Sequence, residues 1–339
     1  MESELLLNLI DALERELQDE TAIDRAIAQL GDLAIYDQNG LTPLHMAVKY
    51  ASLHAVTNLL EAGADPQSQP SGKRYTPMMI PFVSSHVVGK ELKKEIFDVL
   101  LQQGIDLDMQ DIDGNTVLHH AARLMNLEMV EYLIEHCSSV DKKNARGQTP
   151  AMYMALYGAD NPTQHDKLEM LKRLKSKGAD LQTIDDSNMN LIVAVLKNFM
   201  TEYGQDPIEL IGYLMDDCAI PLPQDHRHSL WAYVFNNEFR DDEITTLVHY
   251  LIKKVDINER DANGFKAIHH LYAKNRPNEI ALFKTLFAST FNHEEDHTYN
   301  NGQLLAISDQ IQRDLSSQSI ESLFSNRIYD PIKGSPLNP

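Results

Sequence analysis

One stretch, Asp111 to Asn144, constrains the fold of this chain more than any other. It opens with the turn residues Asp113-Gly114, and the run Thr116–Ala122 then begins a first helix. A second apolar run at helical spacing follows, and a short polar extended piece closes the stretch. The pattern predicts a unit of turn, helix, helix and hairpin within about 33 residues.

The same order of elements recurs in residues 37–69. Thr42 can cap the first helix through its hydroxyl, and Pro43 stands where no backbone N–H is needed. Gly63 can end the second helix. Both stretches resemble the ankyrin-repeat family, whose first helix begins T-P-L-H-x-A; in the later stretch Val117 replaces the proline.

The resemblance implies an all-α fold, an ankyrin-repeat solenoid of about eight stacked helix pairs with short hairpin fingers and degenerate terminal repeats. It also implies that His45, His119 and His269 are the family's structural histidine, which hydrogen-bonds across to neighbouring turns. His120 and His270 stand next to this position and receive no role from the resemblance.

Further helix starts follow the same rhythm, first at Thr76-Pro77 and Thr149-Pro150 and then, with the signature nearly erased, at 191, 230 and 264. We therefore expect four segments along the chain. They are a degenerate N-terminal capping repeat (1–36), well-matched repeats with inserted loops (37–184), degenerate repeats with a C-terminal cap (185–326), and a flexible tail (327–339).

Three repeats carry extra residues between their two helices, at about 83–93, 157–166 and 200–207. Insertions in a solenoid fall in loops on one face and often carry function. A loop of this length also costs little free energy and can drift. Both interpretations stay open.

Charge excludes several classes of partner. The chain has 30 Lys+Arg against 50 Asp+Glu, a net charge of −20, so its surface repels nucleic-acid phosphates and anionic membranes. The local exception is one predicted helix, which is either a binder of an acidic partner or a solvated outer face. Its basic residues are Lys167, Lys172, Arg173, Lys175 and Lys177.

Composition bears on the compartment. No apolar run approaches the ~18 residues that a membrane helix needs, so we expect no membrane insertion. The N-terminus is acidic and lacks a small-residue cleavage site, which argues against a secretory signal. The chain has 2 cysteines, which indicates a reducing compartment rather than a disulfide framework. We expect a cytoplasmic location, which could be the cytoplasm of a host cell after secretion.

Two groups of residues could carry chemistry. His293–His297 matches H-E-x-x-H, a zinc-peptidase motif, but the segment aligns with a hairpin and not with a helix. Cys218 lies near Asp225, His226 and His228 in the sequence and could be a nucleophile.

The repeat pattern argues against the thiol. Cys137 and Cys218 both fall where a repeat places the glycine that ends its second helix, so they are expected to be packing residues. We expect no cofactor, no metal and no enzymatic activity. The alternative is an enzyme whose C-terminal half is a separate catalytic domain, with a thiol hydrolase around Cys218 or a zinc site at His293 and His297.

The resemblance implies binding of a partner protein by a monomer, through a concave groove lined by hairpin tips and the exposed edges of the first helices. We expect Tyr50, Arg123, Arg146, Tyr157 and Phe265 to be the anchors of that contact. The other predicted contact residues are Gln38, Asn39, Leu41, Lys49, Ile112, Asp113, Asn115, Gln148 and Lys274.

The source of the chain is open between two possibilities. Its decay from the consensus, its inserted loops and its acidic balance resemble ankyrin effectors that intracellular bacteria deliver into host cells. A eukaryotic cytosolic adaptor is the competing possibility.

Overall fold

The computed structural model describes residues 2–14, 20–70, 72–84, 94–158, 164–199 and 208–221, together with positions 230, 234, 247–248, 250–251 and 254–255. The chain divides into two compact units, Met1–Ser187 and Asn188–Pro339. Within the described ranges the regular structure is entirely helical, so the fold is all-α.

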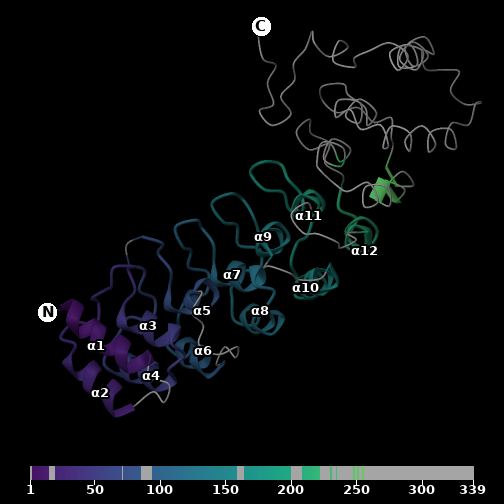
Figure 1. Cartoon of the computed structure of the whole chain (residues 1–339). Helices are drawn as coiled ribbons and strands as arrows, with labels where there is room; N and C mark the ends of the chain where they lie inside the picture. The colour runs from purple at the N-terminus through teal and green to yellow at the C-terminus, as the bar shows by residue number, and fades with distance from the viewer. Residues whose placement is uncertain are drawn as a thin grey trace, which may run out of the picture. The chain divides into compact units, whose positions relative to one another are not determined.

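The first unit is a series of helix pairs (Figure 1). Helices α3, α5, α7 and α9 form one row, called the inner row. Helices α4, α6, α8 and α10 form a second row beside it, called the outer row. Hairpin loops, here called fingers, leave the first row on the side away from the second. The pairs are α1 (Glu2–Glu14) with α2 (Glu20–Gln29), α3 (Pro43–Lys49) with α4 (Leu53–Glu61), η1 (Pro77–Met79) plus α5 (Ile80–Val83) with α6 (Lys94–Leu101), α7 (Val117–Arg123) with α8 (Leu127–Ile134), and α9 (Pro150–Tyr157) with α10 (Gln164–Ser176).

Local sequence explains where these helices begin. The Thr42 hydroxyl accepts a hydrogen bond from the backbone N–H of His45, and the His45 ring accepts one from the backbone N–H of Thr42. Thr116 and His119 form the same reciprocal cap on α7. Proline stands at the first position of α3 and α9, where its missing N–H costs nothing.

The repeat at Thr76 departs from this plan. Its inner helix begins as a 3-10 turn, Pro77–Met79, and continues as a single α-turn, Ile80–Val83. Thr76 makes no side-chain cap bond. Pro77 and Pro81 both lack an N–H, and both lie in a first turn where none is required. The predicted helix is therefore present but split.

Apolar side chains from both rows make the core of the first unit. Leu44, Leu59, Phe82, Phe97 and Leu118 are among the side chains that are almost completely buried. The pair α1–α2 lies at the start of the series and shows water one face, as the 62% exposure of Leu7 shows.

The fingers are joined to one another by backbone hydrogen bonds. The N–H of Ile112 donates to the carbonyl of Lys73, and the N–H of Ala145 donates to the carbonyl of Asp113, each at 3.0 Å. Gly114 has φ +78°, and a Cβ there would collide with the backbone of Ala145. This close approach is why the finger needs glycine.

A second set of contacts joins successive repeats through the outer row. The hydroxyl of Tyr132 donates to Asp98, and the carboxylate of Asp24 accepts from Asn58 at 2.6 Å. In both cases the partners lie 34 residues apart. Polar bonds as well as packing therefore hold these neighbouring repeats together.

The described part of the second unit continues the same plan. It contains α11 (Leu191–Phe199), α12 (Ile208–Gly212) and the π-helical turn η2 (Tyr213–Asp217). Tyr250 donates to Asp216, again 34 residues away, at 3.4 Å. The helix pairs expected after this point, apart from the single positions given above, lie outside the described residues.

Candidate functional site

Most of the predicted contact residues of the first unit are at the surface. Ile112 is 55% exposed and Tyr157 is 40% exposed. The remaining positions are exposed at Gln38, Asn39, Asp113 and Arg146, and half-buried at Leu41, Lys49 and Arg123. Phe265 and Lys274 lie outside the described residues.

The expectation that Tyr50, Asn115 and Gln148 are exposed is wrong. Tyr50 is 9% exposed, because its ring closes the end of α3 and its hydroxyl donates to Glu14 at 2.6 Å. Asn115 and Gln148 are 2% and 3% exposed. Both accept from the amide of Asn144, at 2.9 and 3.2 Å. Asn115 thereby joins its finger to the next one, and Gln148 closes its own finger, so neither side chain faces a partner.

Four rings from three successive repeats stand in sequence along the first unit. Tyr75 meets His120 edge-on, with ring centres 5.8 Å apart, and His120 meets Tyr153 edge-on at 6.4 Å. Tyr153 then meets Tyr157 at 4.9 Å. We call Tyr75, His120, Tyr153 and Tyr157 the aromatic row. It lies between the fingers and the inner helices, since His120 bonds to one finger and Tyr157 to the next.

His120 is fixed by a buried carboxylate. Its Nε2 lies 2.8 Å from Oδ2 of Asp111, and both side chains are almost completely buried. Asp111 also accepts the backbone N–H groups of Asp113 and Asn115 at 2.9 and 2.8 Å. Burial by itself raises the pKa of Asp111, but the hydrogen bonds from His120 and from these amides outweigh it and lower that pKa.

Two arginines flank the aromatic row. Arg123 donates from Nη2 to the carbonyl of Phe82 at 3.3 Å, and Arg146 donates from Nη1 to the hydroxyl of Tyr157 at 3.0 Å. Burial raises the pKa of Tyr75 and of Tyr153, and the charge of Arg123 works against both shifts. Arg123 follows His120 by three residues on α7, a spacing that puts both side chains on one face of the helix. Within the described ranges neither arginine has a carboxylate partner.

The structural role expected for His45 and His119 is confirmed. His45 donates from Nε2 to the carbonyl of Tyr75 at 2.8 Å, and His119 donates from Nε2 to the carbonyl of Gln148 at 3.0 Å. Burial lowers the pKa of each ring to about 4. Both rings are neutral at pH 7. Their Nε2 atoms already bond the backbone of the next repeat, so these rings hold repeats together and are not available for chemistry. His269 lies outside the described residues.

The cysteines do not take the left-handed backbone conformation of the helix-ending glycine whose place in the repeat they occupy. Gly63 has φ +93°, but Cys137 is not left-handed, and in the second unit Ala219 takes the left-handed turn, with φ +50°, one residue after Cys218. Burial raises the pKa of the Cys137 thiol, which lowers its reactivity. Cys218 is 7% exposed. Asp225, His226, His228, His293 and His297 lie outside the described residues.

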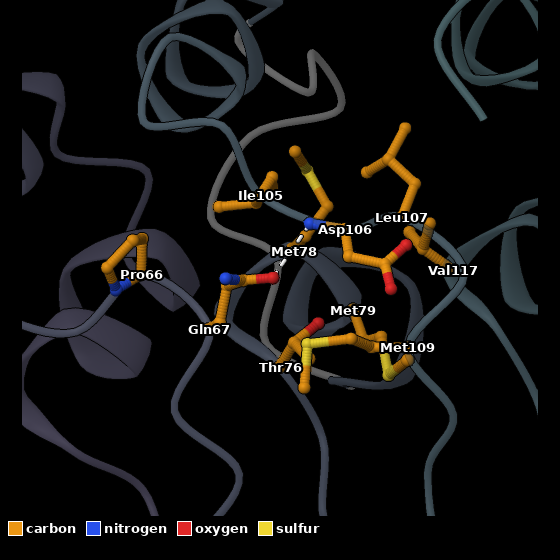
Figure 2. A pocket seen from close by; sticks show the side chains of 10 residues that line it. All are labelled: Pro66, Gln67, Thr76, Met78, Met79, Ile105, Asp106, Leu107, Met109 and Val117. Carbon is orange, nitrogen blue, oxygen red and sulfur yellow. Dashed lines mark hydrogen bonds between the residues drawn. The ribbon is translucent and has the colours of Figure 1, made fainter. Parts of the chain in front are cut away.

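Other candidate sites are limited. No cluster of three His, Cys, Asp or Glu side chains that could hold a metal occurs in the part of the chain that the structure describes. A recess behind the fingers, lined by Gln67, Met78, Asp106 and Met109 among others, has a volume of about 10 Å³ (Figure 2). That is about the space of one water molecule, so it does not fit an organic ligand.

The predicted basic helix is mostly paired. Arg173 contacts Glu131 at 3.2 Å, Lys177 contacts Glu135 at 3.4 Å, and Lys172 contacts Glu169 at 3.0 Å. Lys167 is buried. These cations stabilise the outer row and do not form an open basic patch.

Sequence reasoning missed three members of the aromatic row. Tyr153 precedes Tyr157 by one helical turn, a spacing that puts both rings on one face of α9. Tyr75 stands immediately before Thr76, at a finger base, and His120 follows the structural histidine. The spacing within α9 could have found Tyr153, but the meeting of Tyr75 with His120 depends on how two repeats stack.

Comparison with known proteins agrees with this architecture. The family model for a single ankyrin repeat matches residues 39–70, and the model for three copies of the ankyrin repeat matches residues 85–185. No helix of the described residues is both long and apolar enough to cross a membrane.

Similar proteins come from several kinds of organism. The putative ankyrin repeat protein L371 of Acanthamoeba polyphaga mimivirus is 20% identical over 95% of this chain and 37% of its own length. Palmitoyltransferase AKR1 of Lachancea kluyveri is 30% identical over 53% of this chain and 23% of its own length. The human transient receptor potential cation channel subfamily A member 1 is 29% identical over 42% of this chain and 12% of its own length.

The chain thus spans well under half the length of each of these relatives. The family models therefore identify residues 39–70 and 85–185 of this chain as ankyrin repeats.

Proposed function

We propose that this chain is a non-catalytic scaffold that binds a partner protein, and that the partner contacts the aromatic row together with Arg123 and Arg146. The observation that carries the proposal is the row itself: Tyr75 and Tyr153 are half-buried, Tyr157 is exposed, and the buried ring of His120 joins Tyr75 to Tyr153, so that three successive repeats contribute to one site. Tyrosine and arginine are the residue types that most often dominate the binding energy of protein interfaces.

The surroundings of the row favour binding as well. His120 is held by Asp111, and Tyr157 is held by Arg146, so both rings have defined positions before a partner arrives. Asp111 in turn is held by the backbone of its own finger. A surface ordered in advance loses less conformational entropy on binding, which raises affinity.

The fingers add a peripheral contact to this surface. Ile112 follows Asp111 and is 55% exposed, and its backbone is fixed to the preceding finger at Lys73. A large apolar side chain at a rigid tip can fill a small hollow on a partner. We therefore include Ile112 in the proposed contact surface, with Gln38, Asn39 and Asp113 at its polar rim.

The more specific form of the proposal concerns the place of action. We propose that the protein works in the cytoplasm of a host cell, as an effector of an intracellular bacterium, and acts on a host protein. Its decayed consensus, inserted loops and net charge of −20 support this origin. A fusion to a reporter that becomes active only in host cytoplasm would test it, and a reporter that stays silent during infection would count against it.

Photo-cross-linking tests the contact surface directly. A benzophenone amino acid placed at Tyr157 should capture one partner from host-cell lysate, because that side chain is at the edge of the row and is exposed. The matched control carries the same group at Leu7, which is 62% exposed on the first helix, far along the chain from the row. The double variant Arg146→Ala/Tyr157→Ala should lose that partner in an affinity pull-down while keeping a wild-type circular dichroism spectrum. Equal capture at both positions, or a partner that the double variant retains, would remove the aromatic row from the proposal.

A further inference from the structure

We propose that the segment seated on the aromatic row is an acidic peptide of the partner, with carboxylates that pair with Arg123 and Arg146 and an apolar side chain that packs on the tyrosines. This inference rests on the proposed function and gives the partner's chemistry. It is carried by the way this chain distributes its positive charge.

The chain has 50 acidic and 30 basic side chains, so most cations can find a carboxylate nearby. On the outer row they do. Arg173, Lys177 and Lys172 lie 3.2, 3.4 and 3.0 Å from glutamates. In the second unit Lys254 lies 2.8 Å from Asp216.

The two arginines beside the aromatic row do not follow this pattern, and neither do Arg74 and Lys143 of the fingers, which donate to neutral oxygens. Arg123 donates to a neutral carbonyl and Arg146 to a neutral hydroxyl. A guanidinium has five N–H donors, so each arginine keeps donors for a ligand. Two unmatched cations on a surface of a strongly acidic protein are the charge complement of an acidic partner.

The nearby carboxylates limit where the ligand's acids can lie. Asp111 is buried and already paired with His120, so it repels a ligand weakly. Asp113 is exposed at the finger tip and disfavours a second carboxylate there. The ligand's carboxylates are therefore expected at Arg123 on α7 and at Arg146 in the next finger, away from Asp113, with its apolar side chain between them.

The geometry favours carboxylates over phosphate. Arg123, on α7, donates to the carbonyl of Phe82, whereas Arg146, in the next finger, donates to the hydroxyl of Tyr157, so the two guanidinium groups are held at different points. Sites that read a phosphorylated residue bring several arginines to one point. Two separated arginines suit two separate single charges.

A peptide display experiment tests this inference. A library of random 16-residue peptides is selected on the purified full-length chain, and the enriched peptides are sequenced and synthesised. We expect them to carry at least two Asp or Glu residues around an aromatic or large aliphatic residue. Their affinity should fall about tenfold or more in Arg123→Gln/Arg146→Gln, and should fall in the same direction for Arg146→Gln alone, which removes an exposed side chain and leaves the core untouched.

A charge-matched control separates local contact from net charge. Lys172→Gln/Lys177→Gln removes the same two positive charges from α10, away from the row, and should change affinity less than twofold. Replacing the glutamates of a selected peptide by glutamine should weaken its binding to the wild type about tenfold. The same replacement should leave its binding to the arginine variant unchanged.

The other outcomes are distinct. Selection of neutral or basic peptides that still require Tyr157 would overturn the acidic inference and leave the proposed function standing. A peptide that binds only with phosphoserine in place of its glutamates would also overturn it. Enriched peptides that are insensitive to both Tyr157→Ala and the arginine variant, or no enrichment at all, would overturn the acidic inference and count against the row as a contact surface.

Discussion

The inner helices of this protein begin in two ways, although they occupy equivalent places in the repeat. Those at Thr42 and Thr116 carry histidine three residues on, and each ring bonds the backbone of the next repeat. Those at Thr76 and Thr149 carry Met79 and Met152 instead, both 1% exposed. Methionine fills the same volume as an adaptable apolar side chain but makes no such bond.

A third arrangement opens the second unit. Asn190 accepts the N–H of Val193 through Oδ1 at 3.1 Å, and donates through Nδ2 to the carbonyl of Pro221 at 2.7 Å. One short side chain thus caps its helix and reaches the next loop, the two tasks that Thr and His share in α3 and α7. The comparison teaches that these helix starts keep buried side chains in every case, whereas the polar bond to the next repeat is made by histidine, by asparagine, or not at all from this position.

The largest effect expected from this difference is a loss of stability in mild acid. His45 and His119 have folded pKa values lowered from 6.5 to about 4. Between these values the unfolded chain binds more protons, so the free energy of unfolding falls as the pH drops from 6.5 towards 4. At pH 5 each histidine should cost about 2 kcal/mol relative to pH 7, or about 4 kcal/mol together.

Urea unfolding followed by far-UV circular dichroism at pH 7 and pH 5 checks this. His119→Met, which copies the neighbouring repeats, should remove about half of the difference. Asp111 has a lowered pKa and remains ionised at pH 5, so it should not contribute there. A pH dependence that His119→Met leaves unchanged would mean that the buried rings do not control it.

Next in size is the loss of the bond between repeats. His119→Ala leaves the carbonyl of Gln148 without its donor and opens a cavity under α7, and it should cost about 3 kcal/mol in the free energy of unfolding at pH 7. His119→Met should cost less, because the volume stays filled. Equal losses for the two variants would show that the bond, and not the packing, carries the stability.

Asn190→Ala should cost about 2 kcal/mol, because it removes both the cap of α11 and the bond to Pro221. Hydrogen exchange is the suitable measurement, since the effect should be local: the amides of α11 should exchange faster, whereas those of α7 should not change. Asn190→Asp keeps the cap but loses the donor to Pro221, and should give an intermediate result. Loss of protection in α7 as well would contradict a local role.

The smallest effect concerns the link between the two helices of one repeat. Ala51 has φ +51°, which a residue with a Cβ rarely adopts. Ala51→Gly relieves that strain but adds freedom to the unfolded chain, so a net gain of about 0.5 kcal/mol is expected. Thermal unfolding of the variant beside the wild type should show a melting temperature raised by one or two degrees, and a lowered one would show that the turn is not strained.

The repeat itself could be predicted from sequence because its determinants are local. The Thr-x-x-His start, the helical period of the apolar residues and the turn at Asp113-Gly114 each act over a few positions. The structural roles of His45 and His119 followed from the same motif. The division of the chain at 185 and the flexible tail stay predictions.

It was harder to predict from the sequence which side chains are exposed. Arg146 and Tyr157 are exposed as expected, whereas Tyr50 is buried because Glu14, from a helix 36 residues earlier, accepts its hydroxyl. Asn115 is buried because Asn144 of the next finger packs on it, and Gln148 is buried against Asn144 of its own finger. An exposed position in one repeat becomes an interior position when a neighbour packs on it, and the sequence of one repeat does not contain that neighbour.

The sequence by itself determined the all-helical repeat, the places where helices begin and the strong negative charge, since these follow from short-range bonding and composition. Only the tertiary structure decided that Tyr75, His120, Tyr153 and Tyr157 stand in one row, and that Arg123 and Arg146 beside them lack the carboxylate partners that cations of the outer row find. The reason is physical: stacking brings together side chains from different repeats, and their distances depend on the rotation between neighbouring repeats, which no local pattern specifies.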